Sequence, residues 1–548
     1  MKKKLLLLTT FLFIGIGLAM AQKKVTGVVI SSEDNEPIVG ASVLVKGTTV
    51  GTITDLNGKF SLPNVPNSAR TVVVSYIGMK TQELEIKPSL KIILSSDAKQ
   101  LDEVMVVAYG TVKKSAFTGS ATVVNADQMK TPAASFDKGL AGQVAGVQVV
   151  SQSGQPGSGT SFRIRGAGSL SASNEPLIVI DGVATTNENY SQVAYDNDSS
   201  SNLLASLNPN DIESITVLKD AAAAALYGSR AANGVVVITT KSGKAGKTKV
   251  SFDAKYTSTS LAGKYDLMNS SEYYKQLFNG YLAAGNSVEK ANSLTQGQIT
   301  HNPYNVDNPL DANGNVVGGA KIVVDTDWQK ETFKAADTED YSLGVSGGNE
   351  KSSYFFSVGY LNQNGISPNS NYKRYSGKAN IQTQANSWLK LGLNTTFAYS
   401  IQNTTVAGGA GASPMFNAVQ FPSGVPVYVV DNDGNYVLDA NGKKQYNYTN
   451  PVSIDFNPCA SPYDDVHRSK LYRFLASAFA EVKFFDGLTF KTVFAPDFIY
   501  SPEHRYWNKY HGNGPAYNGR LDKYSTTDLM YTSTNTFNYT KTFSDLHH

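Results

Sequence analysis

The sequence predicts a mainly β protein: a small β-sandwich, then an α+β domain, then the N-terminal part of an antiparallel transmembrane β-barrel. Three observations predict this fold. The chain has 30 tyrosines and 24 phenylalanines against 3 tryptophans, and aromatic residues favour strands. Apolar and polar residues alternate cleanly after Lys247. The links between those strands are alternately short and long, as in outer-membrane barrels.

Composition limits the classes of function. The 548 residues, 41% of them hydrophobic, indicate several folded domains. Forty-eight basic and 45 acidic residues give a net charge of +3, so we expect no nucleic-acid partner. A single cysteine, Cys459, excludes an intramolecular disulfide and a cysteine metal cluster. The six histidines form no ligand-spaced pair on a helix, and no nucleophile elbow is present. We therefore expect no enzyme, no cofactor and no metal site.

Residues 1–21 have the pattern of a secretory signal peptide. Lys2–Lys4 is the charged start, Leu5–Leu18 the apolar run, and Ala19-Met20-Ala21 a small-x-small cleavage site. A transmembrane anchor is the alternative, but the run is short for one. No later stretch reaches the length of an apolar spanning helix, so an exported membrane protein would have to be a barrel.

Residues 22–96 predict a small β-sandwich of short alternating strands. Asn57-Gly58 and Asn35-Glu36-Pro37 are turn signals, and Val72–Ile77 is a core strand. Asp55 and Asn57 offer too few oxygens for calcium, so turn chemistry explains them.

Residues 97–115 predict a strand, Leu101–Gly110, with polar flanks and no hairpin partner nearby. It is either the last strand of the sandwich or a mobile segment that adds as an edge strand to another protein. In the second case Asp102 and Glu103 would set the register. The pattern alone leaves both interpretations open.

Residues 116–247 predict an α+β domain. A short helix begins at Phe136–Ala141, and Gly154–Gly159 is a flexible loop without the lysine and hydroxyl of a phosphate-binding loop. Arg163 and Arg165 share one face, where they would contact an acidic wall or solvent. The expected strands are Gly146–Val150, Phe162–Gly166 and Pro176–Gly182, the last with a turn.

The end of this domain, Asn208–Lys244, predicts a strand, a helix, a tight turn and a strand. Asp211–Leu218 alternates, and Asp220 would cap the alanine run Ala221–Ala225 as a helix of little more than two turns. Gly228 would end the helix at positive φ, and Val235–Thr240 would be a strand buried on both faces. Lys241–Lys244 would be a polar hinge.

Residues 248–548 predict about eight strands of a transmembrane barrel. In one strand Leu389, Leu391, Leu393, Phe397 and Tyr399 face one way and polar residues the other, which fits either a soluble sheet or lipid and lumen faces. The lengths of the links between the strands favour the barrel over the soluble sheet. Short links at 347–350, 386–387 and 486–487 alternate with long ones at 261–336, 362–371, 402–466 and 496–523.

Aromatic residues lie near the strand ends, where a membrane interface would be: Tyr341, Tyr360, Trp388 and Tyr399. A barrel of about eight strands is filled by its own side chains. The domain at 116–247 could not fit inside such a barrel, so either it lies outside or more strands are missing from this chain. The end at Leu546-His547-His548, where a short turn should fall, favours an incomplete barrel.

Taken together, these segments resemble the SusC/RagA family of TonB-linked outer-membrane transporters. The sandwich resembles the carboxypeptidase regulatory-like domain through Val25–Val29, Glu36–Val43 and Gly51–Phe60. Leu101–Gly110 resembles a TonB box. The segments that resemble the family's plug are Gly139–Val147, Phe162–Gly166, Pro176–Val183 and Asn208–Gly234, and Val345–Glu350 resembles an early barrel hairpin.

The resemblance implies plug-gated import of an oligosaccharide or peptide through a wide barrel. TonB, with ExbB/ExbD and the inner-membrane proton gradient, would bind the box at Asp102, Glu103, Val104, Met105, Val106 and Val107. It implies a SusD-like surface lipoprotein as partner, and outer-membrane lipid around the barrel. The plug motif would consist of Asp211, Glu213, Ser214, Lys219, Asp220, Tyr227, Gly228, Arg230, Asn233 and Gly234.

The resemblance also implies a location in the outer membrane of a Gram-negative bacterium, with the plug and N-terminal domain facing the periplasm. The family's barrel has more strands than this chain, so we expect a chain truncated within the barrel. The alternative is a non-transporting surface binding or scaffold protein, or an inactive barrel fragment.

Overall fold

The computed structural model describes residues 22–32, 36–67, 69–76, 79–95, 104–107, 110–113, 121–125, 136–151, 153–166, 174–185, 202–220, 224–405, 411–452 and 455–541. These residues fall into two compact units, one within Met1–Val104 and Lys113–Ala116 and the other within Met105–Val112 and Phe117–His548. Each unit is described by itself.

The first unit is the expected β-sandwich. Its two sheets have the strand orders β4-β1-β7 and β3-β2-β5-β6. Val72 and Val74 are fully buried between them, as expected of a core strand, and Asp55 accepts the backbone N–H groups of Asn57 and Lys59 at 2.9 and 2.8 Å, which makes the expected turn. The strands are β1 (Gln22–Ser31), β2 (Ser42–Val45), β3 (Gly51–Ile53), β4 (Lys59–Pro66), β5 (Thr71–Ser75), β6 (Gln82–Glu85) and β7 (Ser89–Leu94).

The strand expected at Leu101–Gly110 is present over part of its length, as β8 (Val104–Val107). It belongs to neither sheet of the sandwich. It pairs instead with β9 (Gly110–Lys113) in a two-stranded sheet. The expectation that it has no hairpin partner nearby was therefore wrong, because the partner strand follows at once and the polar pattern of β9 concealed it.

The part of the second unit from Ala121 to Thr240, called here the inner segment, is built on a five-stranded sheet of order β10-β15-β16-β13-β14. A separate hairpin, β11–β12, lies beside it. The central strand β16 is parallel to β13 and antiparallel to β15, and its apolar residues Val235–Ile238 are buried on both faces, as expected. The strands are β10 (Ala121–Asn125), β11 (Val147–Ser151), β12 (Thr160–Ile164), β13 (Leu177–Ile180), β14 (Val183–Thr185), β15 (Ile212–Leu218) and β16 (Val235–Thr240).

Most of the helical structure in the described inner segment consists of 3₁₀ turns. Gly228 ends a helical turn at φ 73°, as predicted. Of the helix expected over the alanine run, Ala221–Ala223 lie outside the described residues, Ala224 is α-helical, and a 3₁₀ turn follows it. The helix begun at Phe136 is also a 3₁₀ turn. The turns are η3 (Phe136–Leu140), η4 (Leu203–Ser206), η5 (Pro209–Asp211), η6 (Ala225–Tyr227) and η7 (Ser229–Ala231).

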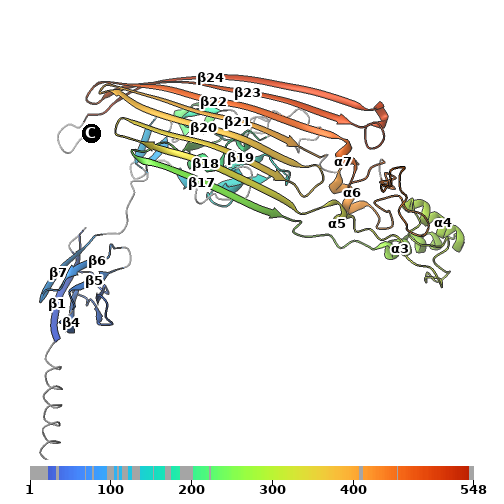
Figure 1. Ribbon diagram of the computed structural model, residues 1–548, viewed down its shortest axis with the longest axis horizontal. Helices are drawn as coiled ribbons and strands as arrows, with labels where there is room; N and C mark the ends of the chain where they lie inside the picture. The colour runs from blue at the N-terminus through green and yellow to red at the C-terminus, as the bar shows by residue number, and fades with distance from the viewer. Residues whose placement is uncertain are drawn as a thin grey trace, which may run out of the picture. The chain divides into compact units, whose positions relative to one another are not determined.

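The eight strands expected after Lys247 are all present and form one antiparallel sheet in sequence order, called here the wall (Figure 1). The inner segment lies against one face of the wall, the inward face, and the other face is the outward face. The strands are β17 (Gly246–Thr259), β18 (Ala336–Gly348), β19 (Ser352–Asn364), β20 (Asn371–Asn386), β21 (Leu389–Asn403), β22 (Val466–Phe485), β23 (Leu488–Trp507) and β24 (Arg520–Tyr539).

The links of the wall alternate between short and long, with two corrections. The Asp486-Gly487 hairpin is as expected, with Gly487 at φ 99°. The link after β19 has only six residues, 365–370, because the strands on both sides run further than the sequence showed. The link after β23 covers 508–519 and not 496–523.

The second correction concerns Pro496 and Pro502, which lie in the stretch expected to be a link. A proline lacks the N–H needed in a strand ladder. Both prolines lie inside β23 and are paired with Tyr531 and Ser525 of β24. On the side of β22, neither proline is paired with a residue of that strand. The ladder is thus interrupted on one side only, and the strand continues.

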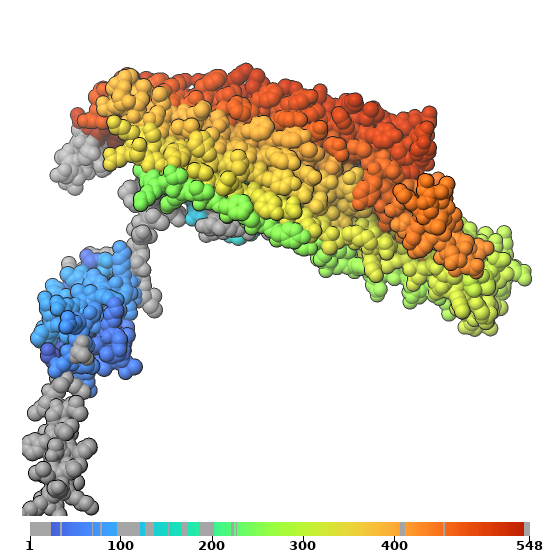
Figure 2. Space-filling model, viewed as in Figure 1, coloured from blue at the N-terminus to red at the C-terminus, as the bar shows by residue number. Residues whose placement is uncertain are grey.

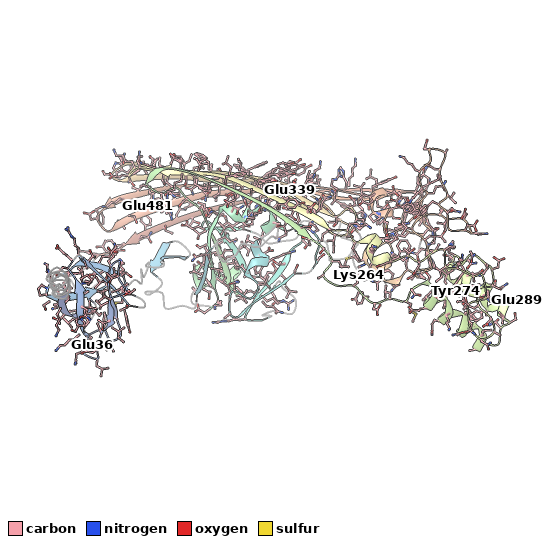
Figure 3. All side chains as sticks on the ribbon, turned by 60° about the horizontal axis from the view of Figure 1, so that its bottom comes forward. Glu36, Lys264, Tyr274, Glu289, Glu339 and Glu481 are labelled. Carbon is pink, nitrogen blue, oxygen red and sulfur yellow. The ribbon has the colours of Figure 1, made fainter. Side chains whose placement is uncertain are left out.

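The longest links are folded, not merely polar and glycine-rich. The links 260–335 and 404–465 share an apolar core that includes Tyr274, Phe278, Trp328 and Phe421. Figure 3 labels Lys264, Tyr274 and Glu289 in this region, at the opposite end of the wall from Glu481. The helices are α3 (Ser270–Ala283), α4 (Val288–Ile299), α5 (Trp328–Thr332), α6 (Pro414–Gln420) and α7 (Ser461–Asp464), and a 3₁₀ turn, η8 (Pro515–Tyr517), lies in the last link.

Sequence reasoning missed these helices, although Asn269 and Glu272 form a capping box at the start of α3. In the described part of the chain, no helix combines the length and apolar character that crossing a membrane would require.

Candidate functional site: the interface between the inner segment and the wall

The inward face of the wall is polar and buried, because alternate residues of each strand point toward the inner segment. Its members include charged side chains that are almost never buried without partners. The buried polar residues of this face include Ser342, Ser357, Arg374, Ser376, Lys378, Asn380, Ser400, Gln402, Arg473, Ser477, Asp497, Ser501, Glu503 and Arg505.

Arg374 of β20 holds the 3₁₀ turn η4 of the inner segment. Its side chain is buried, and Nη1 donates to the carbonyl oxygens of Ala205 at 2.9 Å and Leu207 at 2.8 Å. The hydroxyl of Tyr372, two residues earlier on the same face, donates to the Ala205 oxygen at 3.0 Å. Two wall side chains thus satisfy carbonyl groups that η4 leaves unpaired.

Arg473 of β22 makes a second attachment. Its guanidinium pairs with Asp497 of β23 in a two-pronged ion pair of 3.1 and 2.8 Å, with both side chains no more than 3% exposed. The same group donates to Thr185 Oγ1 at 2.9 Å and to the Leu203 carbonyl oxygen at 3.3 Å. Asp497 therefore fixes an arginine that reaches two separate parts of the inner segment.

Asp181 forms a third attachment, in the turn between β13 and β14. It accepts the backbone N–H and hydroxyl of Thr240 at 2.8 and 2.6 Å, which ties that turn to the end of β16. From the wall, Asn394 and Lys378 donate to the same carboxylate, the lysine at 3.4 Å. Asp181 has a φ of 49°, so the tight turn that presents this carboxylate is in the left-handed region.

Further contacts run along the interface. Asn208 donates to Ser342 Oγ at 3.1 Å, and Gln402 donates to the Pro156 oxygen at 2.8 Å. Asp211 is buried, and burial raises the pKa of its carboxyl above the usual value, although neighbouring cationic side chains oppose that rise. The interface is therefore closed by many hydrogen bonds, together with small apolar contacts in which Leu203 and Ala205 pack against wall side chains.

The hinge expected at Lys241–Lys244 passes close to the wall. A Cβ on Gly243 would lie 2.3 Å from the backbone nitrogen of Tyr354 in β19, so only glycine fits. Beside it a cavity of about 590 Å³ opens between the inner segment and β17–β19. Its lining carries both signs of charge, including Glu213, Lys244, Asp253 and Lys255.

The ten residues predicted as a motif at 211–234 lie in one region, but they do not form one site. Asp211 faces the wall, and Glu213 pairs with Lys244 at 3.1 Å. Lys219 donates to the Ala145 oxygen at 3.1 Å, and Asn233 reaches the Glu175 oxygen at 3.5 Å. The others are Ser214 in β15, Asp220 just after it, Tyr227 packed against the apolar cluster that contains Leu218 and Val235, Gly228 and Gly234 at positive φ, and exposed Arg230.

The predicted box residues are described only in part. Asp102 and Glu103 lie outside the described residues, and Val104, Met105, Val106 and Val107 form β8. Arg163 and Arg165 are both exposed, which supports the solvent interpretation of these two residues.

Sequence reasoning missed the wall residues that hold the inner segment: Arg374, Lys378, Asn394, Arg473 and Asp497. The available signal was charge at inward positions of otherwise alternating strands. Among the described residues, no group of three or more histidine, cysteine, aspartate and glutamate side chains is arranged to hold a metal ion.

Family models match the two parts of the chain that precede the wall. Residues 113–235 match the TonB-dependent receptor plug domain, and residues 25–106 match the CarboxypepD_reg-like domain. The first match covers nearly all of the inner segment, which is called the plug from here on.

Curated relatives and solved structures extend the similarity over the wall. The chain is 37% identical to the TonB-dependent receptor SusC of Bacteroides thetaiotaomicron over 422 residues, covering 76% of this chain and 38% of the relative. It is 32% identical to the TonB-dependent receptor P3 of Formosa agariphila over 502 residues, covering 90% of this chain and 43% of the relative.

The RagAB peptide importer in its open-open state is similar in structure, with a TM-score of 0.62 at 29% identity. That alignment covers 80% of this chain and 47% of that one. The closed-closed state gives a TM-score of 0.60 at 28% identity over 78% and 46% of the two chains.

The chain thus spans less than half the length of the curated relatives it matches. Its plug, its CarboxypepD_reg-like domain and its antiparallel strand wall are those of one family: the chain belongs to the SusC/RagA-type TonB-dependent receptors.

Proposed function

We propose that the protein takes part in TonB-dependent import of a large nutrient across the outer membrane of a Gram-negative bacterium, with the plug as gate. One observation carries the proposal. The wall presents a buried polar face to the plug. Its opposite face is uncharged between the short turns and the level of six tyrosines, Tyr341, Tyr360, Tyr375, Tyr399, Tyr472 and Tyr500. Such a wall fits lipid on one side and a gated lumen on the other.

The many hydrogen bonds between plug and wall support a gate that can move. Polar contacts exchange for contacts with water at small net cost, whereas separating an apolar interface would expose it to water at a cost proportional to its area. A plug held by Arg374, Arg473 and Asp181 can therefore be displaced when water enters. We also propose that the sandwich ends at residue 96, the TonB box and its linker at residue 115, and the plug at residue 247.

We propose that Asp102–Val107 is the handle through which TonB, energised by ExbB/ExbD and the proton gradient, pulls on the plug. The support is the strand character of β8, since a strand can add to the edge of another protein. The N-terminal sandwich and the plug would face the periplasm, and a SusD-like lipoprotein would cap the end that carries the long links.

The substrate class proposed is an oligosaccharide or a peptide. The similar RagAB structures are those of a peptide importer, which supports the peptide alternative. No feature of the described residues chooses between the two classes, and catalysis has no part in the proposal.

The test is a proline substitution in the proposed handle. Proline at Val106 removes an N–H that strand addition needs, whereas alanine at Val106 keeps it. In the receptor expressed in its host, Val106→Pro should abolish uptake of labelled substrate but leave surface binding intact, and Val106→Ala should retain both. Unchanged uptake in Val106→Pro contradicts the proposed energy coupling.

A non-transporting binding or scaffold protein is the alternative. Migration on gels before and after heating separates the two, because only a closed barrel shows a heat-dependent shift. Absence of that shift in an outer-membrane extract supports the alternative and contradicts the transporter.

A further inference from the structure

The outward face of the wall carries a continuous row of stacked tyrosines, one on each strand from β18 to β23. Each is the direct cross-strand partner of the next, and neighbouring ring centroids lie 4.6–6.4 Å apart. The row crosses the sheet along its hydrogen-bonding direction, and its rings are of the kind that form the aromatic girdle at a membrane interface. The members are Tyr341, Tyr360, Tyr375, Tyr399, Tyr472 and Tyr500.

Between this tyrosine row and the short turns, the outward positions of the described strands β17–β24 carry no aspartate, glutamate, lysine or arginine. On β21 the stretch runs from Tyr399 to Leu389. Ten residues at about 3.4 Å each, tilted by about 40°, give a height of about 26 Å, close to the apolar band of outer-membrane barrels. Figure 2 shows this outward face covering the plug.

On the other side of the tyrosine row, toward the long links, the outward face becomes cationic. We consider the next two sets of outward residues that are paired across the strands beyond the tyrosines. Among them, Lys373 projects from β20, Lys470 and Arg468 from β22, and Lys523 from β24. His504 stands between Arg468 and Lys523 in the register. No carboxylate occupies an outward position of these two rows on the described strands β20–β24. Asp337 and Glu339 of β18 lie outside this strip, two strands from Lys373.

The spacing of the four cations suits phosphate groups. Successive outward residues of a strand are about 7 Å apart, and alternate strands are about 10 Å apart. Long lysine and arginine side chains on this lattice can converge on one or two phosphates. Arg468 is already oriented, because Nε donates to Asn403 Oδ1 at 2.8 Å. At about 5–10 Å above the tyrosine row, the cations lie where lipid headgroups begin.

We propose that Lys373, Arg468, Lys470 and Lys523 form a binding site for the phosphates of lipopolysaccharide in the outer leaflet. The proposal rests on the proposed function in one respect, that the long links face outward. Lipopolysaccharide is the occupant because the strip continues the lipid-facing surface and lies at the level of its phosphorylated sugars. A soluble acidic partner would have to approach through the lipid headgroups.

The experiment compares two charge-matched variants of the receptor purified from outer membranes. The test variant is Lys373→Gln, Arg468→Gln, Lys470→Gln and Lys523→Gln. The control removes four cations at the short-turn end: Lys244→Gln, Lys247→Gln, Lys351→Gln and Lys483→Gln. Native mass spectrometry counts retained lipopolysaccharide, and titration with purified lipopolysaccharide, its dephosphorylated form and phosphatidylglycerol vesicles gives affinities. Circular dichroism verifies that each variant is folded.

Each cation near an anionic membrane surface contributes about a fivefold change in affinity. We therefore expect the test variant to lose at least about tenfold in affinity for lipopolysaccharide and the control to stay near wild type. Equal affinity of test and control variants overturns the proposal. The proposal is also overturned if the wild type binds dephosphorylated lipopolysaccharide, or phosphatidylglycerol vesicles, as tightly as intact lipopolysaccharide. Substrate uptake is measured separately, and its absence in the wild type contradicts the proposed function while leaving the lipid site standing.

Discussion

Replacing Arg374 by methionine should loosen one part of the plug and leave the rest attached. The guanidinium donates to two plug carbonyl groups, at Ala205 and Leu207, from a buried position. A hydrogen bond from a charged donor contributes about 1.5–3 kcal/mol, and a buried carbonyl left without a donor costs about as much. Because the Tyr372 hydroxyl still donates to the Ala205 oxygen and water can replace the arginine when the plug shifts, we take the lower end, about 3 kcal/mol for both bonds. This is a factor of about 150 in the local opening equilibrium.

Hydrogen exchange read by mass spectrometry measures this opening. In Arg374→Met, amides of the plug segment 202–211 should exchange about a hundredfold faster than in the wild type. The segment 177–185 should not change, because Arg473 and Lys378 hold it independently. Lys373→Met is the matched control, since Lys373 is the neighbouring residue on the outward face.

Two results would refute this reasoning. Equal exchange of segment 202–211 in Arg374→Met and Lys373→Met would mean that the arginine does not hold the plug. An equal rise in both plug segments would mean that the substitution destabilises the whole receptor and that the attachment is not local.

Three further predictions concern single residues outside the wall strands. Gly243→Ala places a methyl group against the Tyr354 backbone and should lower the free energy of unfolding by about 1–3 kcal/mol. The control Gly263→Ala, with open space around it, should not. Equal melting temperatures of the two variants would contradict the close approach of Gly243 to the wall. Burial raises the pKa of Asp211, so its contribution to folding stability is fully present below the unfolded-state pKa and is lost as the pH rises through the folded-state pKa. Asp211→Asn should therefore melt at a higher temperature than the wild type at pH 7.5 but not at pH 4. A difference in melting temperature that does not change with pH would contradict this prediction. Burial raises the pKa of the Cys459 thiol to about 11, so alkylation at pH 8 should be about a hundredfold slower than for an ordinary thiol, and a rate like that of free cysteine would exclude this.

The sequence predicted the faces of the wall well, because alternation with period two is a local property. Leu389, Leu391 and Leu393 share the outward face as expected, and the Asp486-Gly487 turn is where its residue types place it. The order of strands in the wall also follows from local rules, since short turns make sequential strands neighbours.

The attachments of the plug could not be predicted in this way. Arg374 and Arg473 were recognisable as charges on a polar face, but their plug partners lie at residues 205 and 207 and at 185 and 203, far away in the chain. Pairing over such distances depends on how the plug is docked, which no local pattern contains. The extension of β23 through Pro496 depends in the same way on β24, which supplies the ladder that the proline cannot complete on the other side.

The alternation of the wall strands has a consequence for how this receptor can change. Inserting or deleting one residue within a strand would turn every later side chain of that strand to the opposite face. Arginines that hold the plug would turn to the outward face, and phenylalanines would turn to the inward face. Insertions in the long links leave both faces of the wall intact. Variation in length is thereby directed to the links.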